Sequence, residues 1–311
     1  MKRGFMLCVA MILCVLLSAD KYAQSKNLIY IVMEGTSRST LYSLIKKDKL
    51  PHVQKIIERG NYRNVETTTL NSYDDDLYLS LLLPNTVSPN RVTTSNMTSK
   101  TTIFDVVHET MPSVAISILY TPPDSLATYP LTQAVITTKI QQFPTYSMQQ
   151  KVSSYDVGKK AAAIIEQHSG AFMLFLNYTN VNRVGLKYRE GGELYSQAVF
   201  NVDRSIGLMI NALEAKKQWE NTEFLVVTNY GMVAKTKEKS HKTWVLSTQK
   251  ALRKGTIFDI LPSALSLLDK DEMLKDEASA SLFKINNRSN SARKDTVSED
   301  ASAAVIKKTD Q

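Results

Sequence analysis

Residues 27–35 read NLIYIVMEG, and the character of this run points to one class of structure. Residues 28–33 are all apolar and several are β-branched, which is typical of a strand buried on both faces of a parallel sheet. In open sheets of this kind, ligands bind beyond the carboxyl ends of the strands. The sequence therefore predicts a buried parallel strand here and a binding site at the edge where the strands end.

Similar apolar runs recur along the chain and are separated by amphipathic segments. This alternation predicts an α/β fold, three-layer α/β/α, with a mostly parallel central sheet. We expect 121–153 to be mainly a connection. We expect strands at 62–67, 113–120, 134–140, 171–178, 223–228 and 243–247, and helices at 40–46, 52–59, 75–83, 102–109, 156–168, 193–217 and 257–268.

The first residues have the layout of a secretory signal peptide. Lys2 and Arg3 precede an apolar run at 5–17, and small polar residues fill 18–24. The alternative is a retained membrane anchor, but a spanning helix needs about 20 apolar residues and this run is shorter. We therefore predict cleavage within 19–25, and a protein that is exported and either periplasmic or secreted.

The composition of the two terminal segments predicts how the chain is divided into domains. Cys8 and Cys14 both lie in the apolar run, so the mature chain has no cysteine and can form no disulfide. We expect 1–24 to be the signal peptide, 25–285 to be a single domain without a transmembrane span, and 286–311 to be a disordered polar tail, because that segment has too little apolar content to pack.

The chain is basic. Loss of 1–24 reduces the basic residues from 38 to 35 and the acidic residues from 30 to 29, so the net charge falls from +8 to +6. Lys235, Lys237, Lys239 and Lys242 lie in one predicted loop, which favours phosphate or sulfate groups or an anionic surface. The alternative is a solvated loop without a ligand. We find no nucleic-acid-binding motif.

Four segments carry a resemblance to a known family. They are residues 27–69, which include NLIYIVMEG and LPHVQKIIERGNYRNVETTT, then FLNYTNVNRVGLKY at 175–188, NTEFLVVTNYGM at 221–232 and GTIFDILPSALSLLD at 255–269. In order and spacing they resemble the alkaline phosphatase superfamily, within it the nucleotide pyrophosphatase/phosphodiesterase-like branch. The second and third are similar to the motifs Asp-x-x-Gly-His-x-x-Gly and Ser-Asp-His-Gly-Met.

The resemblance implies an alkaline-phosphatase-like fold and a hydrolase of phosphate or sulfate esters. Members of the superfamily use two clustered metal ions, usually zinc, which stabilise the entering and leaving oxygens of the ester. A metal also activates a serine or threonine nucleophile, which is a weak nucleophile at neutral pH by itself.

At the corresponding positions this chain departs from the family pattern. Amides, a phenol and an aliphatic chain replace most of the ionic ligands, so the resemblance implies a degenerate metal site. The positions equivalent to the family's metal ligands are Glu34 for an aspartate, Asn182 (or, in another register, Asn180) for an aspartate, Leu186 for a histidine, Asn229 and Tyr230 for an Asp-His pair, and the retained histidine His241.

The nucleophile is expected in TTTLNSYDDDLYLSLLLP, residues 67–84. Spacing to the proline of that segment places it at Ser72, with Asn71 as the other register. The aspartates 74–76 follow, and they favour the start of a helix or, alternatively, a bound cation such as magnesium or calcium.

Histidines are too few for a dinuclear zinc site. His52, His108 and His168 fall on predicted helices away from the motifs, which leaves His241 as the ligand candidate. A two-zinc site in this family draws on about three histidines and several aspartates. We therefore expect no metal cofactor.

Two functions remain open from the sequence. The first is a non-catalytic relative that binds a phosphate- or sulfate-bearing ligand or an envelope protein. The second is a phosphoric ester hydrolase with a reduced site, in which Glu34 and His241 hold one divalent metal (zinc, manganese or magnesium) and Ser72 attacks the ester.

Overall fold

The structure is a computed structural model. The expected signal peptide, the segment with Asn71, Ser72 and the aspartates 74–76, and the expected tail lie outside its described residues. It describes residues 26–67, 77, 79–83, 101–120, 135, 142–147, 152–233, 235–236, 239–268 and 281–283.

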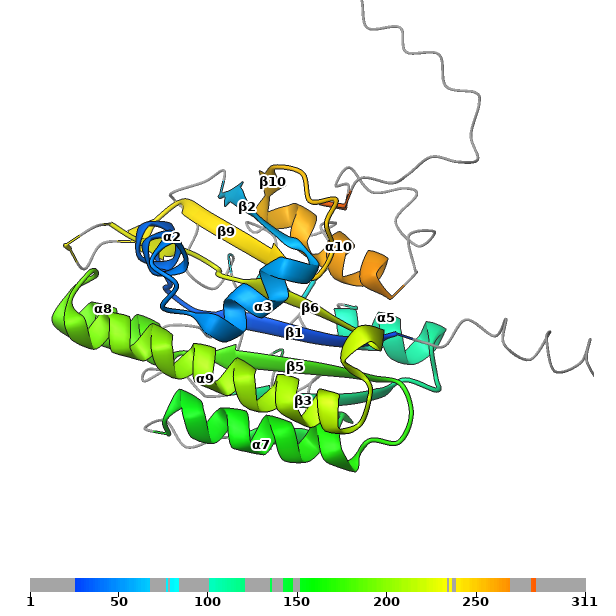
Figure 1. The fold of residues 1–311 in the computed structure, drawn as a ribbon. Coiled ribbons are helices and arrows are strands. Elements are labelled where there is room, and N and C mark those ends of the chain that lie inside the picture. Colours follow the sequence, from blue (N-terminus) through cyan, green and yellow to red (C-terminus); the bar gives the residue numbers. More distant parts are fainter. Residues whose placement is uncertain are drawn as a thin grey trace, which may run out of the picture.

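A mixed, mostly parallel sheet forms the centre of the protein, with strand order β10-β2-β9-β6-β1-β5-β3-β4 (Figure 1). Strand β1 lies between β5 and β6 and runs parallel to both, while β9 runs antiparallel to β6 and β2. A two-stranded sheet, β7-β8, lies apart from it. The strands are β1 Asn27–Met33, β2 Asn61–Glu66, β3 Ala115–Tyr120, β4 Thr145–Ser147, β5 Phe172–Tyr178, β6 Thr222–Val227, β7 Gly231–Met232, β8 Lys239–Ser240, β9 Lys242–Ser247 and β10 Gly255–Thr256.

Helices cover both faces of the sheet, which confirms the expected three-layer α/β/α architecture. Figure 1 shows α7 and α9 together on one face, while α5 and α10 pack against the other. The helices are α2 Arg38–Lys46, α3 Pro51–Arg59, α5 Ile103–Thr110, α7 Ser154–Gln167, α8 Asn180–Tyr188, α9 Glu193–Ala215 and α10 Ile260–Leu267, and the 3-10 helices are η5 Trp219–Asn221 and η6 Ile257–Asp259.

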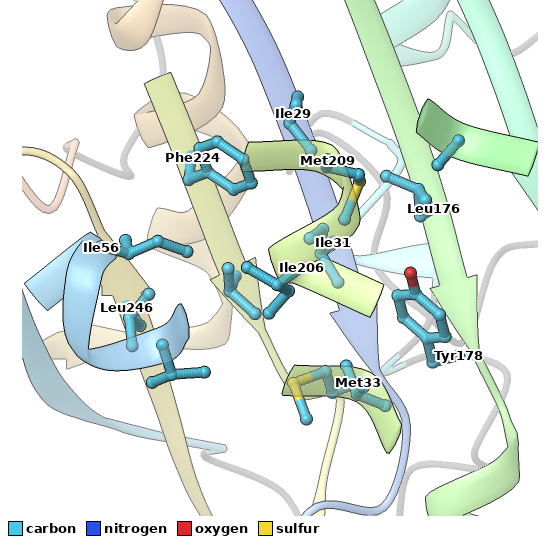
Figure 2. Close-up of a cluster of buried hydrophobic side chains, with 14 of the residues drawn as sticks. Ile29, Ile31, Met33, Ile56, Leu176, Tyr178, Ile206, Met209, Phe224 and Leu246 are labelled. Atoms are coloured by element: carbon cyan, nitrogen blue, oxygen red, sulfur yellow. The ribbon is translucent and has the colours of Figure 1, made fainter. Parts of the chain in front are cut away.

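The two cores follow from the alternation of side chains along β1. Every residue of this strand is buried. Ile29, Ile31 and Met33 point to the face covered by α3 and α9, as Figure 2 shows, whereas the intervening side chains pack with α5 and α10. Burial on both faces is the physical reason for the continuous apolar run that the sequence displays.

Three local expectations need correction. The stretch 121–153 contains β4 at Thr145–Ser147. Val135 is helical, which contradicts a strand at that position, and the rest of the strand expected at 134–140 lies outside the described residues. Helix α8 was not expected from the sequence. The predicted closing helix at 257–268 begins with the 3-10 turn η6, which a capping box between Thr256 and Asp259 holds. Within the ranges that the structure describes, no helix is both long and apolar enough for a membrane span.

Candidate functional site

Three neighbouring parallel strands deliver polar residues to one edge of the sheet. Glu34 follows β1, Thr179 and helix α8 follow β5, and Asn229 follows β6 after a single threonine. The backbone amide of Glu34 donates a hydrogen bond to the carbonyl of Tyr178 at 3.0 Å, and this bond continues the pairing of β1 with β5 to the ends of the two strands. The site thus lies where an open α/β sheet binds ligands.

Glu34 is the centre of this site and is 2 % exposed. Its Oε1 accepts hydrogen bonds from the Asn182 amide nitrogen at 2.9 Å and from the Tyr230 hydroxyl at 3.4 Å. Three positions from three different sequence segments therefore meet at one carboxylate oxygen. Neutral donors satisfy a buried carboxylate that would otherwise be costly to bury.

Lys239 adds a positive charge to this cluster. Its Nζ lies 4.7 Å from the centre of the Tyr230 ring, a cation–π distance. Loss of hydration lowers the pKa of the Lys239 ammonium, and the Glu34 carboxylate acts in the opposite direction. Lys239 thus supplies a cation beside Glu34 from the short strand β8.

The Asn229 side chain stabilises the turn after β6 through hydrogen bonds to the backbone. Its Oδ1 accepts hydrogen bonds from the backbone amides of Gly35 at 3.4 Å and of Tyr230 at 3.0 Å. The side chain is fully buried, yet within the described part of the chain its Nδ2 has no hydrogen-bond partner. The Asn229 side chain can therefore donate a hydrogen bond to a ligand in the site.

His241 lies against Thr67, in the segment that precedes Ser72. Its Nδ1 lies 2.9 Å from the Thr67 hydroxyl, and the Thr67 amide donates to the His241 carbonyl at 3.3 Å. Its Nε2 is buried and has no hydrogen-bond partner among the described residues. Ser72 itself lies outside the described residues, so its position relative to His241 stays a prediction.

The two candidate asparagines differ in their contacts. Asn182 is 8 % exposed and bonds to Glu34, whereas Asn180 is only partly buried and accepts a hydrogen bond from Arg183 at 2.5 Å. Gly35, at φ +70°, lies against Asn182, since a Cβ there would lie 2.8 Å from the Asn182 side chain. Asn182 is therefore the residue that faces Glu34.

Leu186 lies outside this cluster. It occupies α8 and is 42 % exposed, so the aliphatic replacement of the family's histidine faces outward. Arg189, which stands at the last glycine of the motif, adopts φ 74° and ψ 156°, a conformation that glycine favours. Arg189 thus adopts a backbone conformation that suits a glycine at this position.

Glu190 is a residue of this region that the sequence did not reveal. Its carboxylate accepts hydrogen bonds from the hydroxyls of Ser37 at 2.5 Å, Ser39 at 3.1 Å and Thr40 at 2.5 Å, and from the Lys235 amide at 3.2 Å. Burial alone would raise the pKa of Glu190, but these hydrogen bonds outweigh it and lower the pKa. Hydroxyls at a helix start signal a cap, but nothing in the sequence identifies their partner.

The other three histidines lie apart from the site, on or beside helices. His52 is on α3 with its ring against Gly207, and His108 is on α5. His168 follows α7, and its Nε2 lies 3.1 Å from the Ser117 hydroxyl.

A pair of metal ions does not fit the side chains at this site. Asn182, Asn229 and Tyr230 carry no charge, and the Glu34 Oε1 atom already accepts hydrogen bonds from Asn182 and Tyr230. No group of three or more histidine, cysteine, aspartate or glutamate side chains within the described ranges could hold a metal ion. The aspartates 74–76 lie outside those ranges.

Comparisons with known proteins identify the family and the fold of this chain. A family model described as type I phosphodiesterase/nucleotide pyrophosphatase matches residues 85–310. No curated protein matches the chain by sequence.

Solved structures share the fold at low sequence identity. The lipoteichoic acid synthase LtaP from Listeria monocytogenes is 13% identical, with a TM-score of 0.58 over 84% of this chain and 75% of that chain. The alkaline phosphatase of the Antarctic bacterium TAB5 is 10% identical, with a TM-score of 0.58 over 79% of this chain and 98% of that chain. An alkaline phosphatase superfamily protein from Vibrio parahaemolyticus is 15% identical, with a TM-score of 0.56 over 79% and 67%. These similarities show a shared alkaline-phosphatase-like fold.

Proposed function

Because this chain belongs to the type I phosphodiesterase/nucleotide pyrophosphatase family, we propose that it is an exported, non-catalytic member of the family. In this proposal the site around Glu34 binds a phosphate- or sulfate-bearing ligand without a metal ion. Export rests on the signal-like segment at 1–24, and the ligand class rests on the chemistry of the site.

One observation carries the proposal: the Asn182 amide and the Tyr230 hydroxyl both donate to Glu34 Oε1. Two positions that resemble metal ligands of the family thus act as neutral donors to a third. Phosphoryl transfer depends on concentrated positive charge around the reacting group. In the family, that charge comes from metal ions held by carboxylate and imidazole ligands. Neutral replacements weaken the binding of such ions, which favours ligand binding over catalysis.

The same site keeps groups that suit an anion. Lys239 provides a cation, and Asn229 Nδ2 is a buried donor without a partner. Hydrogen bonds from such groups to the oxygens of a phosphate or sulfate are charge-assisted and stronger than neutral ones. A single anionic group can therefore be held here without a divalent cation.

Thermal unfolding of the full chain tests this proposal. We expect inorganic phosphate or sulfate to raise the melting temperature in the presence of EDTA, because a ligand that binds only the folded state stabilises it by about 2.7 kcal/mol at a hundred times Kd. The Lys239→Gln variant should lose this response. Lys250→Gln, which removes an exposed lysine beyond the far end of β9, should retain it.

A metal-dependent response would contradict the proposal. If phosphate stabilises the chain only after zinc or manganese is added, or if Lys239→Gln responds as the unmodified chain does, the site does not bind anions as we propose.

The alternative is a hydrolase with a reduced site, and one observation favours it. His241 Nε2 is buried with no partner in the ranges that the structure describes, and its Nδ1 contacts Thr67, five residues before Ser72. Assays with p-nitrophenyl phosphate and bis-p-nitrophenyl phosphate, with zinc, manganese or magnesium, separate the two functions. Turnover that Ser72→Ala abolishes would establish the hydrolase and overturn the non-catalytic assignment.

A further inference from the structure

Exposed apolar side chains gather at the end of the molecule beside the site. Five large hydrophobic side chains are exposed among the described residues, and four of them belong to this end: Leu186 (42 %), Tyr188 (49 %), Leu194 (54 %) and Val233 (39 %). We call these four residues the end patch. Single exposed apolar side chains are ordinary, but a group of them marks an interaction surface.

Two contacts between elements bring the members of the end patch together. Leu186 and Tyr188 lie on α8, and Leu194 lies in the first turn of α9, which packs against α8. Val233 follows β7, and β7 lies directly on α8, because a Cβ at Gly185 would be 2.2 Å from Met232 Sδ. Figure 1 shows the α8–α9 turn and the β7–β8 hairpin side by side at one end of the protein.

Buried hydrogen bonds hold this surface in place. The Glu190 carboxylate accepts from the Lys235 amide at 3.2 Å, and the Glu190 amide donates to the Thr236 carbonyl at 3.2 Å. The α8–α9 turn and the hairpin are therefore fastened to each other. The end patch is a preformed surface, so little conformational entropy is lost when it binds.

Basic side chains surround the end patch. Among the described residues, Lys187, Arg189, Lys235 and Lys242 are all exposed there, against two exposed acids, Glu193 and Glu66, which lies opposite Lys242. The Lys187 Nζ lies 5.0 Å from the centre of the Tyr188 ring, so cationic and aromatic groups are presented together. This excess of positive charge favours an anionic partner.

The arrangement of the exposed side chains favours a lipid bilayer over an acidic protein as the anionic partner. The apolar side chains project from a helix, a helix start and a hairpin, each between 39 % and 54 % exposed. Leucine and tyrosine tips with flanking lysines can enter the headgroup layer while the ammonium groups stay at lipid phosphates. Each lysine or arginine near an anionic bilayer strengthens binding by about fivefold.

We propose that the end patch docks this protein on the surface of an anionic lipid bilayer, with the site around Glu34 close to that surface. Leu186, Tyr188, Leu194 and Val233 enter the headgroup layer, and the neighbouring basic side chains contact lipid phosphates. This inference is independent of what the site around Glu34 binds.

Hydrogen–deuterium exchange of the full chain on vesicles tests the inference. Vesicles of phosphatidylcholine alone are compared with an equimolar mixture of phosphatidylcholine and phosphatidylglycerol. We expect the mixture to slow amide exchange in 186–194 and around Val233, and phosphatidylcholine alone to leave it unchanged. The local readout separates this contact from any binding through the apolar N-terminal segment, which acts on both vesicle types.

Substitutions in the end patch and in the surrounding basic residues test which side chains contact the bilayer. Lys187→Gln/Lys235→Gln should raise the phosphatidylglycerol concentration for half-maximal protection about 25-fold, since each charge contributes about fivefold. Tyr188→Ser/Leu194→Ser should abolish the protection. The matched controls Lys250→Gln and Tyr155→Ser, an exposed lysine and an exposed tyrosine outside the patch, should behave as the unmodified chain.

Two results would overturn the inference. One is equal exchange of 186–194 on both vesicle types. The other is the same slowing with soluble inorganic phosphate in place of vesicles, which would assign it to a free anion.

Discussion

A single buried carboxylate, Glu190, organises the surroundings of the site. It accepts three hydroxyl donors from the start of α2 and one amide from the β7–β8 hairpin. Hydrogen bonds to a charged group are worth about 1.5–3 kcal/mol each in mutational series. A negative charge at the first turn of α2 is also favourable, because that end of a helix carries partial positive charge.

Glu190→Gln should therefore destabilise the protein by about 2 kcal/mol at pH 7. Since folding lowers the pKa of Glu190, its stabilisation is complete above the ordinary pKa of about 4.3 and is lost as the pH falls through the lower, folded value. The difference in the free energy of unfolding between the two proteins should be constant from about pH 7 to 5 and narrow below about pH 4. Urea unfolding across this range measures it.

Glu58→Gln, which changes an exposed carboxylate on α3, is the control and should alter stability by less than about 0.5 kcal/mol. A difference for Glu190→Gln that stays the same at low pH would show that the charge of Glu190 is not what stabilises the fold.

At the scale of elements, α8 decides how the site is built. It begins two residues after β5, carries Asn182 to Glu34 on its buried side, and exposes Leu186 on the other. Its close approach to β7 depends on Gly185, because a Cβ there would meet Met232 Sδ at 2.2 Å and the Tyr195 ring at 2.9 Å. Helix and hairpin thus share one tightly packed contact.

Gly185→Ala should cost about 1–3 kcal/mol through overpacking. Met232→Ala opens space at the same contact. The double variant should therefore lose about 1 kcal/mol less free energy of unfolding than the sum of the losses in the two single variants. Denaturant unfolding of the four proteins measures this coupling.

The pair Gly185→Ala and Met209→Ala is the matched control. Met209 is buried on α9 (Figure 2), 14 residues beyond Tyr195 and so about 21 Å along that helix. Its effect should add to that of Gly185→Ala within about 0.5 kcal/mol. Additivity in the Met232 pair would mean that the two side chains do not compete for one space.

At the scale of the whole molecule, stability is concentrated in three central strands. All residues of β1, β5 and β6 are buried, and β1 pairs in parallel with both neighbours. The hairpin β7–β8 pairs only two residues from each strand and lies apart from the main sheet. The site therefore spans a rigid part and a less strongly held part of the fold.

Amide exchange should follow this division. The amides of β1, β5 and β6 should exchange only when the whole domain unfolds, with a strong dependence on denaturant, because their exposure requires global unfolding. The amides of β7 and β8 should exchange through local opening at much lower free energy. Hydrogen exchange at increasing denaturant measures both, and equal protection of the hairpin and β1 would contradict the division.

The sequence predicted the central strands to within one or two residues, since burial on both faces requires a continuous apolar run that is visible along the chain. It did not predict α8, where polar, glycine and apolar residues are mixed. Nor did it predict the direction of β9, because the apolar pattern of a strand is the same in either direction.

The candidate site also has features that the sequence predicted and features that it could not predict. By itself, the sequence determined the fold class and which residues stand at the ends of the strands, because these depend on local patterns and on a resemblance to known motifs. Only the tertiary structure decided that Asn182 and Tyr230 donate to Glu34 and that Glu190 joins α2 to the hairpin. The physical reason is separation along the chain: Glu34 is 148 residues from Asn182, and Glu190 is 153 residues from Ser37, so only the packing of the sheet and helices brings these polar groups together.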